Sequence, residues 1–203
     1  MKKLMKWAII PVMLLTILEF TELASDKMCL HDDLIRLHVV ANSDSAEDQA
    51  LKLQVRDAIV NRLEPAMQIA ADKDQAHAYI LQNLKELETA ANQVLQEQGS
   101  YDRATVTLTQ EEFSVRHYDT FSLPSGIYNS LRVEIGEGSG QNWWCVVFPS
   151  LCLPATVNEF QDTAVSSGFQ EDLSKTLARG SGYEIRFFLL DCLGWLENFF
   201  HKG

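Results

Sequence analysis

The sequence IRLHVVANSDS, at residues 35–45, predicts a strand, a tight turn and the start of a helix. Apolar residues occupy the odd positions of this stretch up to Ala41, which is the period of a partly buried strand. Asn42 ends the pattern, and Ser45 precedes Asp48 by three residues, as in a capping box. We therefore expect the chain to turn after Ala41 and to enter a helix directly after Ser45.

Two helices are expected after this turn. Apolar residues recur at helical spacing over residues 51–63, and this helix is predicted to end near Pro65, because proline has no N–H group to donate. A second run of three- and four-residue steps covers residues 80–94, before Gly99, a residue type common just after a helix. The two helices are predicted to form one layer.

The second half of the chain is predicted to contain most of the strands. Short β-like runs occupy residues 105–109, 113–117, 127–135 and 143–148, and the sequence LPSG at residues 123–126 is typical of a turn. The short connections favour antiparallel pairing. Helices followed by strands predict an α+β fold, in which a two-helix layer lies against a mostly antiparallel sheet.

The C-terminal part of the chain has a weaker pattern. Residues 155–182 are interrupted by serine and glycine and are expected to be irregular or weakly helical. Residues 183–187 alternate as in a last strand. Residues 189–200 predict an amphipathic helix that has Trp195 and Phe199 on one side.

The N-terminus is typical of an export signal. Three lysines precede an apolar run over residues 7–18. A helix of this length spans about 18 Å, which is shorter than the roughly 30 Å hydrocarbon core of a bilayer. We predict a cleaved signal peptide or a short membrane anchor at residues 1–24, a polar linker at residues 25–33 and a single exported domain at residues 34–203.

Acidic residues outnumber basic ones, at 28 Asp and Glu against 17 Lys and Arg. Without residues 1–24 the excess is slightly larger, since that segment has more lysines than glutamates. This charge argues against nucleic acid and anionic lipid as main partners and favours a protein partner. The four cysteines form neither a CxxC pair nor a cluster with histidine. We therefore expect no metal, no cofactor and no small-molecule substrate.

A glycine-rich segment, GEGSGQ at residues 136–141, has the composition of a phosphate-binding loop. Such a loop has to open a helix, whereas this one precedes the β-like residues 143–148, so we expect a hairpin or an irregular β loop. Glycines also let another backbone come close. Trp143 and Trp144 point to opposite faces of a strand, so at most one enters the core by default, and the other is either an exposed aromatic anchor or is covered by the C-terminal helix with Trp195. This segment is the first candidate contact with a partner.

His38, Asn42, Asp44 and Ser45 form the densest polar group of the chain, at the end of a strand where ligands often bind in α/β proteins. Asn42 and Asp44 also suit a tight turn and Ser45 a helix cap, and this structural explanation is favoured. The group is the second candidate contact.

Cys145 has a catalytic and a structural interpretation. With His38 or His117 and with Asp44 it would make a cysteine hydrolase, in which imidazole takes the thiol proton. A cysteine within an apolar strand is more often an inert small residue or a disulfide partner, and a bridge to Cys152 is the alternative. We predict no catalytic residue.

Two long blocks of this sequence are similar to the stage II sporulation protein R family. The first covers residues 35–45 and extends through Arg56-Asp57, and the second covers residues 131–149 on both sides of the glycine-rich segment. Residues 183–187 also resemble the family near its C-terminus. The resemblance lends no established catalytic residue to any of these positions.

The resemblance implies a secreted signalling protein of endospore formation. Such a protein is made in the forespore and exported into the space between the two membranes of the septum. Its implied partner is a membrane-embedded receptor protease of the mother cell, which processes the precursor of a sigma factor. A secreted cysteine-type hydrolase that acts on septal wall or protein is the alternative. The partner-binding candidates are Gly136, Gly138, Ser139, Gln141, Asn142, Trp143, Trp144, His38, Asn42 and Asp44, and the candidate disulfide joins Cys145 and Cys152.

Overall fold

The computed structural model describes residues 21–28, 30, 33–152, 157–166, 169–178 and 184–201. Most of the predicted signal peptide lies outside these residues. In the described part of the chain, no helix is long and apolar enough to cross a membrane.

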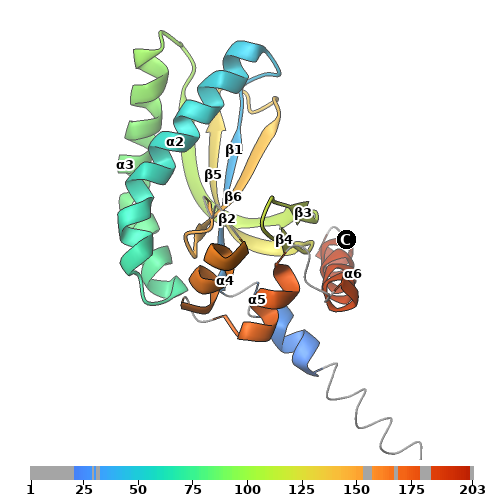
Figure 1. Cartoon of the computed structure of the whole chain (residues 1–203). Coiled ribbons are helices and arrows are strands. Elements are labelled where there is room, and N and C mark those ends of the chain that lie inside the picture. Colours follow the sequence, from blue (N-terminus) through green and yellow to red (C-terminus); the bar gives the residue numbers. More distant parts are fainter. Residues whose placement is uncertain are drawn as a thin grey trace, which may run out of the picture.

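A four-stranded sheet forms the centre of the protein (Figure 1). Its strand order is β2-β5-β1-β6, with bounds Ile35–Val40 for β1, Ala104–Phe113 for β2, Gly126–Ile135 for β5 and Asn142–Phe148 for β6. β5 pairs antiparallel with β2 and parallel with β1, and β1 pairs antiparallel with β6. The predicted α+β fold with a mostly antiparallel sheet is confirmed.

β1 is buried on both faces, whereas its alternation predicts a partly buried strand. Leu37 and Val39 lie in the core under the helices. The side chains of Arg36 and His38 point to the other face, yet these two residues are only 0% and 5% exposed. The strand lies between β5 and β6, so aromatic side chains from its neighbours cover these polar residues as well.

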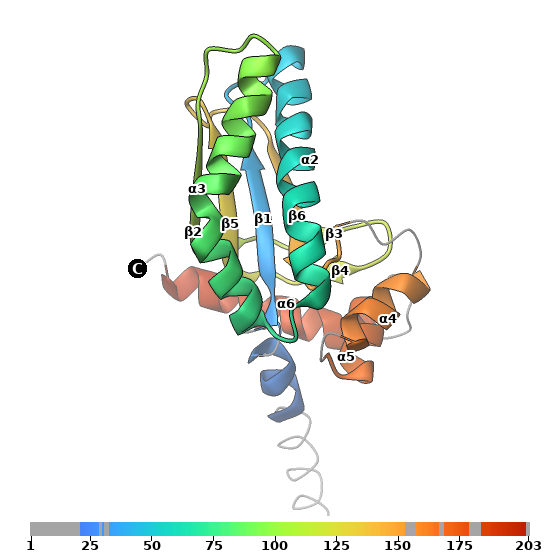
Figure 2. The ribbon, with the colours of Figure 1, turned by 90° about the vertical axis from the view of Figure 1, so that its left-hand side faces the viewer.

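Helices α2 (Ala46–Ile69) and α3 (Lys73–Glu97) cover one face of the sheet (Figure 2). The hydroxyl of Ser45 accepts a hydrogen bond from the N–H of Asp48 at 3.1 Å, which caps α2 as predicted. Gly99 follows α3 with a positive φ of 75°, a conformation that favours glycine. The predicted two-helix layer is therefore present.

Helix α2 continues through Pro65, where the sequence predicts its end. The carbonyl that loses its partner belongs to Asn61, four residues earlier, and both residues are exposed. Water can therefore bond that carbonyl. Met67 is buried in the core one turn later, and its apolar contact favours continuation of the helix.

Three further helices lie around the lower end of the sheet in Figure 1, and the last of them is on the side away from α2 and α3. They are α4 (Val157–Ser166), α5 (Glu171–Leu177) and α6 (Glu184–His201). A small hairpin of β3 (Arg116–His117) and β4 (Ser122–Leu123) lies beside them. Side chains of the three helices, of β4 and of the chain between β3 and β4 form a second hydrophobic cluster with the sheet.

Two of the predicted strands differ from the structure. The expected run over residues 113–117 is divided between the end of β2 and the short β3. The expected last strand is wrong, because the described part of residues 183–187 begins α6, while the predicted helix over residues 189–200 is confirmed. Within the helix Leu190 is buried in the second hydrophobic cluster and Arg186 bonds Asp26, and such contacts with distant segments are not visible in the local alternation.

Residues 21–28 are helical, although the sequence predicts a polar linker from residue 25. Leu23 is buried in the second cluster, and buried Asp26 accepts a hydrogen bond from Nε of Arg186 at 2.9 Å. Lys27 pairs with Glu197 at 2.9 Å. Asp26 and Lys27 thus attach the start of the predicted linker to α6.

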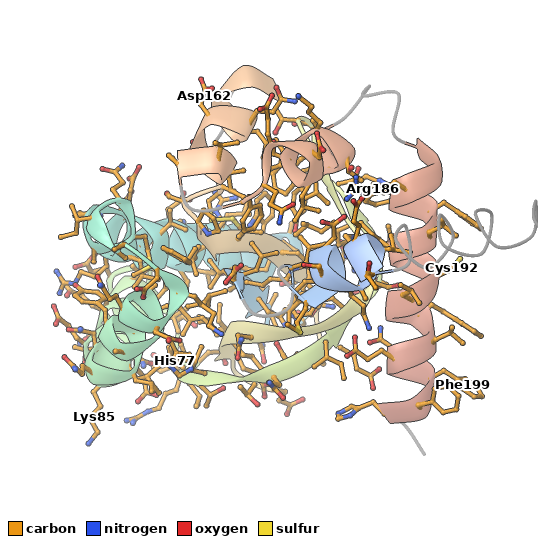
Figure 3. All side chains as sticks on the ribbon, turned by 90° about the horizontal axis from the view of Figure 1, so that it is seen from below. His77, Lys85, Asp162, Arg186, Cys192 and Phe199 are labelled. Carbon is orange, nitrogen blue, oxygen red and sulfur yellow. A yellow bond between two sulfur atoms is a disulfide. The ribbon has the colours of Figure 1, made fainter. Side chains whose placement is uncertain are left out.

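The outer side of α6 carries exposed aromatic residues, as its amphipathic pattern predicts. Trp195 is 60% and Phe199 62% exposed, and their rings stack with centroids 5.7 Å apart. Figure 3 shows Cys192 and Phe199 pointing away from the body of the protein. On the inner side, Gly194 packs directly on the backbone of Ser125.

Candidate partner-binding site

The glycine-rich loop folds onto the turn between β1 and α2. Asn42 Oδ1 accepts a hydrogen bond from the N–H of Glu137 at 3.0 Å, and Asp44 Oδ1 accepts one from the N–H of Gln141 at 2.7 Å. The Ser139 hydroxyl donates to the carbonyl of Asn42 at 2.6 Å. The two candidate contacts predicted from the sequence therefore form one unit, which we call the loop platform (residues 41–45 and 136–141).

This contact explains two glycines of the loop. Gly136 has a positive φ of 59°, and a Cβ atom there would lie 2.2 Å from Oδ1 of Asn42. A Cβ atom on Gly140 would lie 2.3 Å from the carbonyl oxygen of Ser43. The sequence predicts that these glycines admit the backbone of a partner, but the atoms that approach them, the Asn42 side chain and the Ser43 backbone, belong to the chain's own turn. The partner contact stays a prediction, and it now rests on the exposed Ser139 and Gln141.

The loop is irregular, as predicted, and it is not a hairpin. It connects β5 with β6, and β1 lies between these two strands in the sheet. The loop therefore crosses the end of β1, which is where Asn42 and Asp44 project from the turn. Lys52 of α2 supports the crossing, since its Nζ donates to the carbonyl of Gln141 at 2.9 Å.

The structural explanation of the turn is confirmed for Ser45, which caps α2. Asn42 Nδ2 and the Ser43 hydroxyl both donate to Oδ2 of Asp48, at 3.2 and 2.5 Å. The hydrogen bond from Ser43 is the main reason why the pKa of Asp48 is lowered from its usual value. A negative charge in the first turn also suits the helix dipole.

The two tryptophans of β6 point to opposite faces of the sheet, as predicted. Trp143 is 37% exposed, and the guanidinium of Arg56 lies 4.3 Å from its ring centroid. Trp144 stacks on His38 with centroids 3.7 Å apart. Trp195, offered by the sequence as a cover for one of them, stacks within α6 instead. Trp143 is therefore the more accessible anchor.

His38 belongs to a charged network on the sheet face opposite α2. Its Nδ1 lies 3.1 Å from Oε2 of Glu111, and its Nε2 lies 2.7 Å from Oδ1 of Asn142. Arg132 donates to Glu111 at 2.8 Å and to Glu134 at 2.6 Å. The network joins β1, β2, β5 and β6 side by side, so it ties the base of the loop platform to the whole sheet.

Glu111 is held ionised by this network. Burial alone would raise its pKa, but hydrogen bonds from His38 and Arg132 outweigh burial and lower the pKa from 4.5 to about 2. The sequence does not indicate this role, because Glu111 falls between the predicted strands at residues 105–109 and 113–117, where a glutamate normally faces solvent. Its partners come from strands that are distant in the sequence.

Glu111→Gln is expected to lower the free energy of unfolding at pH 7 by about 1–2 kcal/mol, after allowance for solvent screening. Because the folded-state pKa is depressed, the contribution of Glu111 is complete above pH 4.5 and is lost as the pH falls toward 2. Denaturant titrations at several pH values should therefore show the wild type and the variant converging in acid. Glu137→Gln, at an exposed position, is the control, and a constant difference down to pH 2 would contradict the assignment.

Cys145 forms a disulfide with Cys152. A bonded sulfur has no thiolate to attack a substrate, so the geometry does not support the hydrolase interpretation. His38 projects from the opposite face of the sheet, since it pairs with Trp144 rather than Cys145 in the register. His117 and Cys145 line one cavity next to β6. The Nδ1 of His117, however, lies 2.8 Å from the hydroxyl of Ser122 and so is engaged with that side chain.

Arg36 is a buried cation that the sequence does not distinguish from a solvent-facing residue. Its guanidinium carbon lies 3.9 Å from the ring centroid of Phe113 and 4.9 Å from that of Tyr128. One of its nitrogens donates to the hydroxyl of Tyr118 at 3.0 Å. The cation–π packing holds the guanidinium against β2 and β5, and its hydrogen bond to Tyr118 attaches the β3–β4 hairpin, which carries Tyr118 between its strands, to the sheet.

An open cavity of about 440 Å³ lies next to β6. Its walls come from α2 and from the chain between β3 and β4, and Trp143 and the disulfide contribute to it. Among the residues that the structure describes, no three His, Cys, Asp or Glu side chains are grouped to hold a metal ion. This part of the surface combines an exposed loop, a half-exposed tryptophan and an adjoining cavity.

Comparison with known proteins identifies the family of the chain. A sequence profile described as stage II sporulation protein R (spore_II_R) matches residues 31–158, which is more than half of the chain. The stage II sporulation protein R of Bacillus subtilis (strain 168) is 28% identical over 187 residues, covering 83% of this chain and 82% of that protein. No solved structure matches. The matched residues contain β1, the loop platform and β6, and the chain belongs to the stage II sporulation protein R family.

Proposed function

We propose that this protein is exported and acts as a signal between the two compartments of a sporulating cell. It activates a membrane-embedded receptor protease of the mother cell, which then processes the precursor of a sigma factor. The protein acts in the intermembrane space of the septum, where its N-terminal segment either has been removed or tethers it. The receptor contacts the loop platform together with Trp143 and Trp144.

Family membership over residues 31–158 is the observation that carries this proposal. The N-terminal lysines and the apolar run over residues 7–18 support export. The acidic composition favours a protein as the partner, and the exposed loop platform beside an aromatic anchor offers a surface of suitable chemistry. The disulfide fits an oxidising compartment outside the cytoplasm.

Reconstitution in a bacterium that does not form spores tests the proposal. The receptor protease and the sigma factor precursor are produced together with this chain, and conversion of the precursor is followed by immunoblot. We expect conversion when residues 1–24 are replaced by an unrelated cleavable signal peptide, and none when they are deleted and the protein stays in the cytoplasm. Absence of conversion with a protein that is demonstrably exported would refute the proposal.

Gln141→Arg is expected to reduce precursor conversion by about tenfold or more, because it places a bulky cation on the exposed loop platform at the point of contact. Its backbone bonds to Asp44 and Lys52 do not involve the side chain, so the fold should persist. Gln82→Arg, on the exposed side of α3, makes the same chemical change elsewhere and should leave conversion unchanged.

Equal tolerance of Gln141→Arg and Gln82→Arg, with equal melting temperatures, would move the receptor contact away from the loop platform. Gln82 is a better control than Glu88 of the same helix. The carboxylate of Glu88 accepts a hydrogen bond from the N–H of Val106, so its replacement would also disturb the sheet.

A further inference from the structure

β6 is an edge strand, and its outward backbone groups can be assigned from two hydrogen bonds. The carbonyl of Gln141 accepts from Ala41 at the end of β1, so Gln141 faces β1. The carbonyl of Val146 accepts from Leu151, which lies outside the sheet. Since backbone groups alternate in direction along a strand, Asn142 and Trp144 also direct their N–H and C=O groups away from β1.

The outward groups of Asn142 and Trp144 have no backbone partner among the described residues. Exposed edges of this kind are usually blocked by the protein itself. The next outward residue, Val146, is blocked by the chain itself. The turn that the disulfide closes places the N–H of Leu151 on the carbonyl of Val146. On the opposite edge of the sheet, the side chain of Asn92 bonds both backbone groups of Ala104.

The open part of this edge adjoins the cavity of about 440 Å³. Arg56 and Val60 of α2 line it on one face of the sheet, and residues 117–121 of the β3–β4 hairpin line it on the other. Figure 2 shows the hairpin reaching beyond β6 on the side where the sheet ends. The cavity therefore runs past the strand edge, with Trp143 and the disulfide as part of its lining.

We propose that an extended segment of the partner adds to β6 as a fifth strand, pairing its backbone with Asn142 and Trp144. This inference rests on the proposed function and names the mode of recognition. Backbone hydrogen bonds supply affinity in such complexes, and side-chain pockets supply specificity. The cavity volume lies within the roughly 300–1,000 Å³ of ligand pockets, so an apolar side chain of the added strand enters it against Trp143 and Val60.

Hydrogen exchange of the full exported protein, alone and in complex with the detergent-solubilised receptor protease, tests the pairing directly. In the free protein, the amides of Asn142 and Trp144 should exchange much faster than that of Cys145, which faces β1. In the complex, exchange at Asn142 and Trp144 should slow by at least about tenfold. Unchanged exchange at both amides in a stable complex would overturn the added strand and leave the proposed function standing.

A pair of substitutions at Asn142 isolates the outward N–H group. Asn142→Ala removes the side chain that meets His38 but keeps the N–H, whereas Asn142→Pro removes both. Proline is tolerated at the first residue of an edge strand, so both variants should fold. We expect the proline variant to bind the receptor at least about fivefold more weakly than the alanine variant, which corresponds to one lost hydrogen bond.

Equal affinity of the two variants at equal thermal stability would overturn the proposal. If the proline variant fails to fold, the exchange experiment on the unmodified protein decides alone. Failure of the unmodified protein to bind the receptor and to trigger precursor conversion would overturn both the added strand and the proposed function.

Discussion

Replacing Gly194 by alanine should displace helix α6 from the body of the protein. A Cβ atom at this position would lie 1.6 Å from the carbonyl oxygen of Ser125. Helix propensity alone would favour alanine by about 1 kcal/mol. The clash outweighs this gain, because a backbone oxygen cannot move out of the way as the tip of a flexible side chain can. We expect a loss of about 3 kcal/mol or more, and a melting temperature lower by roughly 10 °C.

Hydrogen exchange and thermal unfolding measure this effect. Ser125 donates two hydrogen bonds to Oδ1 of Asp191 in α6, and the amide of Ser125 should lose protection when the helix moves. Gly99→Ala is the control, because no atom lies within 4 Å of a Cβ there and only its positive φ of 75° opposes the change. A Gly194→Ala variant as stable as the Gly99→Ala variant would contradict the close packing of α6.

Replacing Cys152 by alanine should lower the free energy of unfolding by about 2 kcal/mol, because the disulfide no longer restricts the unfolded chain. The bridge closes a short segment, with a sequence separation of 7, so the effect lies toward the low end for disulfides. Cys152 is only partly buried, so removing its sulfur disturbs the packing less than removing that of Cys145 in the core would. Denaturant unfolding without reductant provides the measurement.

A reductant supplies the control for the disulfide. With reductant present, the wild type and the Cys152→Ala variant should become nearly equally stable. In the absence of reductant, the Cys192→Ala variant should be as stable as the wild type. The same variants test the hydrolase alternative. A Cys145→Ala protein that is folded and exported but inactive, beside an active Cys152→Ala protein, would indicate a chemical role for Cys145.

Local patterns in the sequence predict the parts of this fold that depend on neighbouring residues. Ser45 caps a helix and Gly99 ends one, because each acts on backbone groups within a few positions of itself. The opposite directions of Trp143 and Trp144 follow from the alternation of any strand. The layer of α2 and α3 follows from their apolar periodicity.

The features that the sequence does not predict depend on contacts between distant segments. Alternation places Arg36 on the other face of β1, but only the position of β1 within the sheet shows that Phe113 covers it. Pro65 is accommodated within α2 because its position is exposed, so water can bond the carbonyl that loses its partner and little free energy is lost. The glycines of the loop platform look available to a partner until the turn that fills their space is known.

The central place of β1 also determines when the protein can fold. Ile35 pairs with Asn129 on one side and with Phe148 on the other, although it stands near the start of the domain. A chain that emerges from its N-terminus, from the ribosome or across a membrane, therefore cannot close the sheet until residue 148 has appeared. Topologies with such distant pairings fold slowly, because the loop entropy is lost before the contacts form. The loop platform and β6 therefore reach their places beside β1 only after nearly three quarters of the chain has emerged.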